Sequence, residues 1–499
     1  MLSDGVIVTS FGNSEAQLES LRWRPPPRAT IEAYGSFAPI PIQVPQPAPP
    51  PPGYPAPLPQ RPLPPVPKDA IERHATKPNW GYGPPCKTGA TGEGVACMWA
   101  TYQPIIRPWA PTAQHNHTVH GFIEPPLVVQ GKRLLSQSGS VIYSSTDEGK
   151  SFAALCAMPK DKAAGVAGFA NGLGLLSDGT LLAARYYTKK VTGSNLTRIS
   201  TFVYTSKLPS SEDEISSCKW SVGFELPPRG SHLNSVGGGL GIRYTEEPSL
   251  ASGSGSGSAR GVLIAVRSEL THTIAGVALS KSEQVGAAVI YRSSDSGKSF
   301  SAHGSLSDWT SETDLIFPVS PSERVVLAVA RYQTRHFASE RYDTGALTNA
   351  TSVDYKSIAV FRSTDGGATF GPPGLVTGQG QQSGSFVQMA DGSIVLAFGH
   401  KDAGEGQKFI VSYDNGLSWS NGVWDLHRGG LYASSVAVGE DYEIMTAYSC
   451  TTDSQSLCPE RGGMLTTLRW KPPAYAEVAR GGFFFPVAPD GAREPSSLW

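Results

Sequence analysis

The 499-residue chain has few charged side chains and no excess of either sign. Charged residues make up 17% of the sequence, against roughly 25% in an average soluble protein, and 41 Lys and Arg stand against 42 Asp and Glu. Without a basic excess there is no overall field to hold nucleic acid or an anionic membrane surface. No apolar run approaches the ~18 residues that a membrane-spanning helix needs. These absences exclude a histone-like binder and a protein with membrane-spanning helices.

The cysteines lack the CxxC pair and the spacing typical of zinc ligands. The six cysteines also include Cys156 and Cys218, and two pairs, Cys86/Cys97 and Cys450/Cys458, each flank a short turn-rich stretch and suit local disulfides. The three glycosylation sequons begin at Asn116, Asn195 and Asn349. The first residues, MLSDGVIVTSF, lack the basic and long apolar regions of a signal peptide. Cysteines and sequons together nevertheless favour a secreted or cell-surface protein.

Helical periodicity is also missing, whereas Gly (55) and Pro (41) are abundant. No 15-residue window repeats its apolar residues every 3.6 positions, so we expect little helix. Residues 41–67 are dominated by proline, which indicates an extended spacer within a linker over 41–80. Later segments are short and β-rich, and SDGTLLAAR (177–185) and ADGSIVLAF (390–398) place Asp-Gly before an alternating run, as SDGVIVTSF (3–11) also does. That pattern predicts β-hairpins.

One octapeptide pattern, S-x-D-x-G-x-[ST]-[FW], occurs four times. Its aspartates are Asp147, Asp295, Asp365 and Asp414. The Ser and Asp side chains are suited to bonding nearby backbone amides, Gly permits a positive φ, and the final aromatic residue fits a core. We therefore predict four rigid turns in a repeated β unit, with a degenerate unit between the first two, where residues 201–224 have strands but no octapeptide.

A segment near the N-terminus duplicates one near the C-terminus. Residues 21–40 and 468–487 share nine identities at a constant offset of 447, and DGVIVTSF (4–11) resembles DYEIMTAY (441–448). We interpret residues 1–40 as the C-terminal segment of a preceding tandem copy; the alternative is an independent hairpin. The expected domains are this segment, the linker over 41–80, a main domain over 81–487 and a tail over 488–499.

The four octapeptides are Asp-box (BNR) repeats, and through them the chain resembles the sialidase, or neuraminidase, superfamily over about residues 81–487. The resemblance implies an all-β fold, a six-bladed propeller of four-stranded antiparallel blades. The six blades are expected near 120–156, 165–222, 235–302, 312–372, 382–421 and 432–470. A strand from before residue 120 completes the last blade. Asp boxes lie away from the catalytic centre in this superfamily and also occur in propellers that are not enzymes.

Sialidases use a tyrosine nucleophile, an activating glutamate, an acid/base aspartate and three arginines that hold the sugar carboxylate. Glu312 opens a segment, ETDLIFPVSPSERVVLAVAR, that is similar to the family's glutamate-to-arginine hairpin and ends at Arg331. Tyr432 in GGLYASSVAV is similar to the nucleophile segment of the last blade. The alternatives are an exposed loop glutamate, a strand-end arginine and a packing tyrosine. If the assignment is right, these three side chains converge on the propeller axis.

The remaining family positions match less well. In the fifth blade the expected arginine is replaced by His400-Lys401, and Arg267 in GVLIAVRSEL is a further candidate cation at a strand end. The first arginine is absent from GFIEPPLVV (121–129), and residues 127–144 contain no Asp or Glu to serve as the acid. Arg107 and Arg133 are alternatives for the lost arginine, with nothing to choose between them.

These observations leave two classes of function. The chain is either a sialidase-like glycoside hydrolase, an exo-α-sialidase that retains configuration through Tyr432 and Glu312, or a non-catalytic glycan-binding or structural propeller in a tandem array. Its partners are glycans and tandem copies of the same domain. No cofactor or metal is expected, because HNHTVH (115–120) has no acidic or cysteine ligand nearby and favours a solvated loop.

Overall fold

The structure is a computed structural model, and its backbone is described over most of the β-rich region. The described residues are 7–12, 18–23, 105–117, 125–159, 166–167, 172–190, 197–208, 218–227, 244–246, 261–270, 273–274, 277–278, 285–308, 310–318, 324–332, 357–377, 381–400, 406–428, 431–438, 443–450, 464–484 and 486. Two compact units divide the chain: Met1–Ala56 with Tyr82–Gln103, and Pro57–Gly81 with Pro104–Trp499. Among the described residues no helix is long and apolar enough to cross a membrane.

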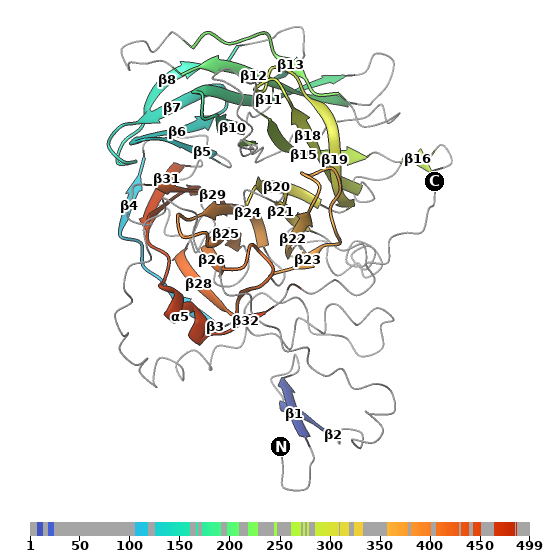
Figure 1. The fold of residues 1–499 in the computed structure, drawn as a ribbon, viewed down its shortest axis with the longest axis vertical. Helices are drawn as coiled ribbons and strands as arrows, with labels where there is room; N and C mark the ends of the chain where they lie inside the picture. The colour runs from blue at the N-terminus through green and yellow to red at the C-terminus, as the bar shows by residue number, and fades with distance from the viewer. Residues whose placement is uncertain are drawn as a thin grey trace. The chain divides into compact units, whose positions relative to one another are not determined.

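The second unit contains six sheets that follow one another along the sequence (Figure 1). Blade 1 is β5 (Leu127–Gln130), β6 (Arg133–Ser138), β7 (Val141–Ser145) and β8 (Ala153–Ala157). Blade 2 is β10 (Gly172–Leu175), β11 (Thr180–Lys190), β12 (Thr197–Lys207) and β13 (Phe224–Glu225), with β9 (Val166–Ala167) beside β11. Blade 3 is β14 (Tyr244–Glu246), β15 (Val262–Leu270), β18 (Val285–Ser293) and β19 (Ser301–Asp308).

The later blades repeat the same antiparallel order. Blade 4 is β20 (Thr310–Ile316), β21 (Val326–Tyr332), β22 (Ser357–Ser363) and β23 (Gly374–Leu375). Blade 5 is β24 (Gln381–Gln388), β25 (Ile394–His400), β26 (Gly406–Ser412) and β28 (Gly422–Arg428), with β3 (Ile105–Pro108) added in parallel. Blade 6 is β29 (Leu431–Val438), β30 (Glu443–Cys450), β31 (Met464–Trp470) and β4 (Ala113–Asn116). Smaller elements are β16 (Thr273–Ile274), β17 (Val277–Ala278), β27 (Trp419–Ser420), β32 (Phe483–Phe484) and α5 (Tyr475–Arg480).

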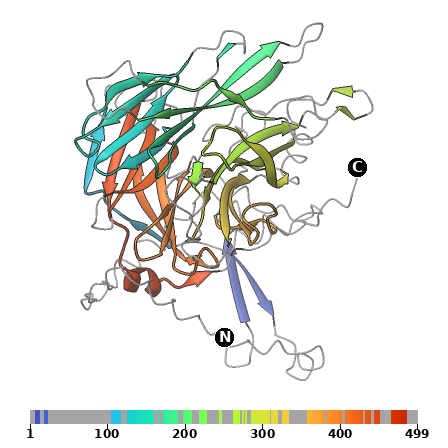
Figure 2. The same cartoon turned by 45° about the horizontal axis from the view of Figure 1, so that its top comes forward.

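The blades close into a ring through their innermost strands. Each innermost strand contacts the innermost strand of the next blade, in the order β5, β10, β14, β20, β24 and β29, and β29 contacts β5. The strand before residue 120 that the sequence predicts for the last blade is β4, which pairs antiparallel with β31 (Figure 2). The predicted six-bladed β-propeller is therefore confirmed. Its core lies between the blades, in separate apolar clusters such as the one that joins Leu182 and Ala184 of blade 2 to Val262 and Ile264 of blade 3.

The four octapeptides form the turns between the third and fourth strands of blades 1, 3, 4 and 5. In the first, the Ser145 hydroxyl donates to Asp147 Oδ1 at 2.8 Å and accepts the Gly149 amide at 2.8 Å, while the Ser151 amide donates to Asp147 Oδ1 at 2.9 Å. Burial opposes ionisation of Asp147, but the hydrogen bonds from Ser151 and Ser145 outweigh it and lower its pKa to about 2. Equivalent bonds recur at the other three aspartates, Asp295, Asp365 and Asp414.

Each octapeptide glycine has a positive φ and lies against the preceding blade. A Cβ on Gly297 would come within 2.3 Å of Leu182 in β11, and one on Gly416 within 2.6 Å of Leu327 in β21. Because third strands end where second strands begin, these turns lie at the opposite end of the propeller from the C-terminal ends of the second strands. The turns therefore fasten neighbouring blades at one end and leave the other end for a site.

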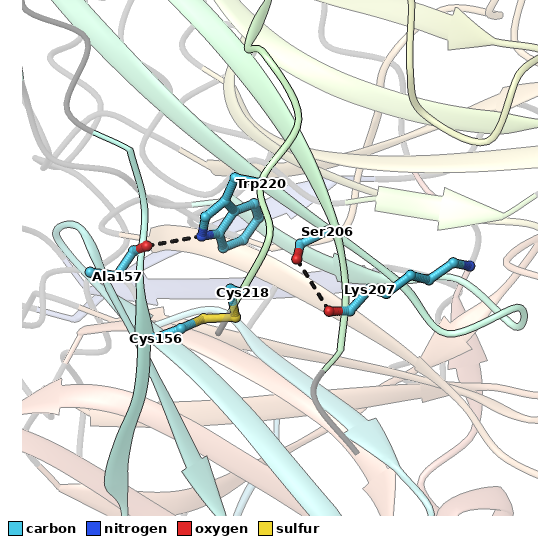
Figure 3. The surroundings of a disulfide bond; sticks show 6 residues. All are labelled: Cys156, Ala157, Ser206, Lys207, Cys218 and Trp220. Atoms are coloured by element: carbon cyan, nitrogen blue, oxygen red, sulfur yellow. Dashed lines mark hydrogen bonds between the residues drawn. A yellow bond between two sulfur atoms is a disulfide. The ribbon is translucent and has the colours of Figure 1, made fainter. Parts of the chain in front are cut away.

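A disulfide joins the outer strand of blade 1 to the segment between β12 and β13 of blade 2. Cys156 in β8 is bonded to Cys218, 62 residues later, and Trp220 Nε1 donates to the Ala157 carbonyl at 2.9 Å (Figure 3). Cys156 and Cys218 are the two cysteines outside the pairs that the sequence suggests. The pairs expected between Cys86 and Cys97 and between Cys450 and Cys458 lie outside the residues whose side chains are described.

The first unit contains a hairpin, β1 (Ile7–Gly12) with β2 (Leu18–Trp23). Its register places Ile7 opposite Trp23, and in blade 6 the register places Ile444 opposite Trp470. These are the residue pairs that the duplicated sequences align. The two hairpins therefore share both sequence and strand register. The proline-rich linker and the tail over 488–499 lie outside the described residues.

Candidate functional site

The innermost strands of blades 4, 5 and 6 each contain a β-bulge at the same place. Two consecutive residues of the inner strand lie opposite one residue of the second strand: Ser311 and Glu312 opposite Arg331, Gln382 and Ser383 opposite Gly399, and Tyr432 and Ala433 opposite Tyr448. Bulges redirect side chains and are frequent beside active sites. Glu312 and Tyr432, predicted from different motifs, thus lie in equivalent bulges two blades apart, Glu312 at the second bulge position and Tyr432 at the first.

Glu312 and Arg331 form a buried ion pair within blade 4. The two side chains are 3% and 5% exposed, and Arg331 Nη2 lies 2.5 Å from Glu312 Oε1. Ser311 bridges them, because its hydroxyl donates to Glu312 Oε2 at 2.7 Å and accepts Arg331 Nε at 3.1 Å. A glutamate and an arginine 19 positions apart in sequence are thereby held in one geometry. The alternative of an exposed loop glutamate is wrong for Glu312.

Asp314 fixes this bulge to the next blade. Its Oδ1 accepts the Leu315 amide at 2.9 Å, and its Oδ2 accepts the Phe386 amide of β24 at 2.8 Å. β20 and β24 are the innermost strands of blades 4 and 5. The Asp314 carboxylate therefore links the two blades at a position two residues after Glu312. Asp314 is 6% exposed and has a positioning geometry rather than one open to a ligand.

A polar layer covers the apolar cluster between blades 4 and 5. The cluster contains Val329 of β21, Phe398 of β25 and Ile410 of β26. Side chains alternate along a strand, so Arg331, His400 and Lys408 continue the same faces two residues further on. The buried polar residues at this end of the gap between blades 4 and 5 are Glu312, Asp314, Arg331, His400 and Lys408. The end of this inter-blade gap is therefore strongly polar.

Lys408 is the cation that the structure describes in blade 5. It is 2% exposed, and its ammonium lies 3.2 Å from Asp425 Oδ1. Lys401, the residue predicted for this role, lies outside the described residues. The only sequence signal for Lys408 is its position at the start of the apolar run FIVS before the fourth octapeptide.

Two other predicted site residues are described only through their backbone. Tyr432 lies in β29 and Arg267 lies in β15 opposite Ala288, and neither side chain is among those described. The structure thus brings Glu312 and Arg331 together. The convergence of these two with Tyr432 stays a prediction, as do the roles of Arg267 and Lys401.

Blade 1 supplies neither the missing acid nor the missing arginine among its described residues. Arg133 begins β6, at the opposite end of its strand from the position that Arg331 holds in blade 4, and its Nε donates to the Ser144 hydroxyl at 2.9 Å. Arg107 lies in β3, on the outer edge of blade 5, and its side chain is outside the described part.

Arg185, in the second strand of blade 2, was not among the predicted site residues. Its side chain is only 8% exposed, its Nη1 donates to the Pro159 carbonyl at 3.0 Å, and its guanidinium lies 5.5 Å from the centre of the Tyr187 ring. The signal was present in the sequence: TLLAAR (180–185) and VLAVAR (326–331) are similar strands that both end in arginine.

The histidine-rich segment is part of the core rather than a solvated loop where it is described. His117 is 5% exposed, its Nε2 is 3.0 Å from the Thr467 hydroxyl, and its ring meets Phe152 edge-on. Burial, reinforced by the charge of His115, lowers the pKa of His117 to about 4. No group of three or more potential metal ligands occurs among the residues that the structure describes.

Comparisons with known proteins give structural similarity without sequence similarity. No family model and no curated protein matches the chain. A crystal structure of a protein of unknown function from Dyadobacter fermentans is 14% identical with a TM-score of 0.49, covering 72% of this chain and 99% of that one. Trypanosoma rangeli sialidase in complex with the inhibitor DANA is 14% identical with a TM-score of 0.45, covering 73% of this chain and 58% of that one. An α-L-arabinofuranosidase from Fusarium graminearum is 13% identical with a TM-score of 0.44, covering 74% of this chain and 98% of that one.

Proposed function

We propose that this protein is a sialidase-like, carbohydrate-active propeller that binds terminal acidic sugars at the site end of blades 4 to 6 and hydrolyses them. The observation that carries the proposal is the buried Glu312–Arg331 pair in a bulge equivalent to the one that contains Tyr432. The four octapeptides, taken as Asp boxes, support the same assignment. Secretion or surface location is part of this proposal, since glycan substrates of this kind are extracellular.

Each of the three residues has a chemical role that its type suits. Tyr432 is the nucleophile, because a neutral phenol avoids repulsion from the carboxylate of the sugar. Glu312 accepts the phenolic proton as Tyr432 attacks the anomeric carbon. Arg331 binds the sugar carboxylate through its planar guanidinium, while Glu312 and Ser311 hold that guanidinium in place. Lys401 and Arg267 are proposed as further cations at the substrate.

The absence of an acidic residue from 127–144 predicts a particular substrate preference. General acid catalysis contributes about 10²–10⁴ in rate, and it matters most when the leaving group is an alkoxide. A phenolic leaving group departs as an anion without protonation. We therefore expect hydrolysis of aryl sialosides and much slower hydrolysis of sialyl-lactose.

The test is release of 4-methylumbelliferone from its sialic acid glycoside by the wild-type chain, Tyr432→Phe and Glu312→Gln. Wild-type turnover that falls at least about 100-fold in Tyr432→Phe supports the nucleophile. Turnover that survives Tyr432→Phe contradicts it. Asp178→Asn, in an exposed hairpin turn of blade 2, is a control that should keep full activity.

A non-catalytic glycan-binding propeller is the second candidate, and the engagement of both Glu312 carboxylate oxygens favours it. In that case the wild-type chain binds sialosides, as calorimetry would show, and releases no product between pH 4 and pH 8. Tyr432→Phe would then leave the affinity nearly unchanged.

We also propose that residues 1–40 are a second copy of the last-blade hairpin, from a tandem arrangement of propellers. The shared register of β1–β2 and β30–β31 supports it. Deleting residues 1–40 should then leave the Tm of the propeller within about 1–2 °C of the wild type, by calorimetry. A larger fall would mean that the hairpin stabilises this propeller itself.

A further inference from the structure

Arg185 presents a buried positive charge at the site end of blade 2. It follows the apolar part of β11, and its side chain is 8% exposed. Arginine remains protonated in proteins, so burial cannot remove this charge. Taking a charge out of water is unfavourable unless another charge or a set of hydrogen bonds compensates it.

Among the described residues no carboxylate lies within ion-pair distance of Arg185. Its Nη1 donates to the Pro159 carbonyl and its guanidinium lies against the Tyr187 ring, but its buried Nε has no acceptor in the described part of the chain. Arg331, with almost the same exposure, has a glutamate at 2.5 Å. The charge of Arg185 is thus left for an external anion to neutralise.

Gln137 of β6 adds an acceptor beside this donor. Its Nε2 lies 3.5 Å from the Ala184 carbonyl and 3.1 Å from Met158 Sδ, so it contacts the neighbours of both Arg185 and Pro159. Its Oε1 is buried and has no donor in the described structure, and the residue is 1% exposed. One buried donor and one buried acceptor therefore lie unsatisfied in the same inter-blade gap.

The strap over 156–159 holds this arrangement in place. The disulfide fixes Cys156 and Trp220 holds the Ala157 carbonyl (Figure 3). The Pro159 carbonyl accepts a hydrogen bond from Arg185. Three of the four residues of this short segment, 156, 157 and 159, are therefore fastened to blade 2. A guanidinium positioned in this way is organised before any ligand arrives.

We propose that Arg185 binds the carboxylate of the acidic sugar, and that Gln137 Oε1 accepts a hydrogen bond from a hydroxyl or amide of the same sugar. This inference rests on the proposed function and assigns the arginine that the first blade lacks to the second blade. The ligand class is a carboxylated sugar with neighbouring donors, because the gap offers one cationic donor and one neutral acceptor.

The experiment measures binding of N-acetylneuraminic acid and of its uncharged methyl ester to the full chain by calorimetry. We expect the wild type to prefer the acid by about tenfold or more, since hydrogen bonds to charged groups are the stronger ones. Arg185→Gln should reduce that preference severalfold, because Arg331 still contacts the carboxylate, and Arg133→Gln, at the opposite end of the propeller, should keep it in full. An Arg185→Gln variant that keeps the preference would overturn the inference.

Arg185→Lys guards against a variant that does not fold. It retains the charge and loses the Nε donor, so it should show a reduced preference for the acid at an unchanged Tm. Sodium sulfate at equal ionic strength is the second arm: an Arg185-dependent rise in Tm with sulfate as large as that with the acid would mean a general anion site and would overturn the sugar assignment.

These outcomes separate this inference from the proposed function. Acid preference lost in Arg331→Gln but kept in Arg185→Gln contradicts only the role of Arg185. No binding of either sugar by the wild type contradicts both. If turnover depends on Tyr432 but the preference for the acid over the ester does not depend on Arg185, the proposed function stands and Arg185 has no part in it.

Discussion

Two buried arginines occupy second strands of the same propeller and are compensated differently. Arg331 in blade 4 is paired with Glu312, whereas Arg185 in blade 2 has a carbonyl and an aromatic ring. A paired arginine contributes to a stable, organised site, because removing it leaves a buried carboxylate alone. An arginine without a carboxylate lowers stability and gains most from an anionic ligand. Under the proposed function, this difference means that blade 4 organises the site and blade 2 supplies charge for the ligand.

The largest expected effect comes from replacing each arginine by methionine, which keeps most of the aliphatic stem. Arg331→Met should lower the free energy of unfolding by about 3–5 kcal/mol, because Glu312 becomes a buried unpaired charge. Arg185→Met should leave it unchanged or raise it. Urea denaturation measures both.

The Arg331→Met, Glu312→Gln double variant is the control for the first effect. It should be more stable than Arg331→Met alone, since no unpaired charge remains. Equal destabilisation by Arg331→Met and Arg185→Met would contradict the comparison between the two blades.

Removal of the disulfide tests whether the segment it holds positions Arg185 in blade 2. Cys156→Ala with Cys218→Ala opens a loop of 62 residues and should lower the free energy of unfolding by about 2–4 kcal/mol. The strap that holds Pro159 loosens, so the preference for acid over ester should also weaken. A destabilised variant with the full preference would show that the strap does not position Arg185.

The octapeptide glycines allow the two strands to be disturbed in the same way. A Cβ on Gly297 would displace Leu182 in the strand of Arg185, and one on Gly416 would displace Leu327 in the strand of Arg331. We expect each alanine variant to lower the free energy of unfolding by about 2–3 kcal/mol, from overpacking added to the positive φ.

Gly179→Ala and Gly392→Ala are matched controls, because both positions have a positive φ and open space around the Cβ. They should lower stability by only about 1–2 kcal/mol, the effect of the backbone alone. If thermal denaturation shows controls and octapeptide variants to be equal, the turns do not lock the blades together.

The last prediction concerns a buried group that can lose its charge. The pKa of His117 is about 4, below its ordinary value of 6.5, so the unfolded chain binds more protons between these values. The free energy of unfolding should fall as pH drops from 6.5 to 4, with no further contribution from His117 below pH 4. His117→Gln should show a shallower dependence over that window, and an unchanged dependence would contradict the assignment.

Much of the fold could be predicted because its signals are local in sequence. In each octapeptide the serine bonds the glycine amide four residues later, so one short motif defines a whole turn and its repetition counts blades. Glu312 and Arg331 could also be predicted, since one hairpin contains both. Arg185, Lys408 and the Cys156–Cys218 bond could not, because their partners lie 17 to 62 residues away and share no motif with them.

The sequence by itself determined the β-rich repeat, the hairpin turns, the closure of the last blade by an early strand and the duplicated hairpin. The tertiary structure decided which charges are buried together and which are left without a carboxylate. The physical reason is that turn hydrogen bonds depend on a few neighbouring residues, whereas burial and charge compensation depend on how the faces of adjacent blades meet.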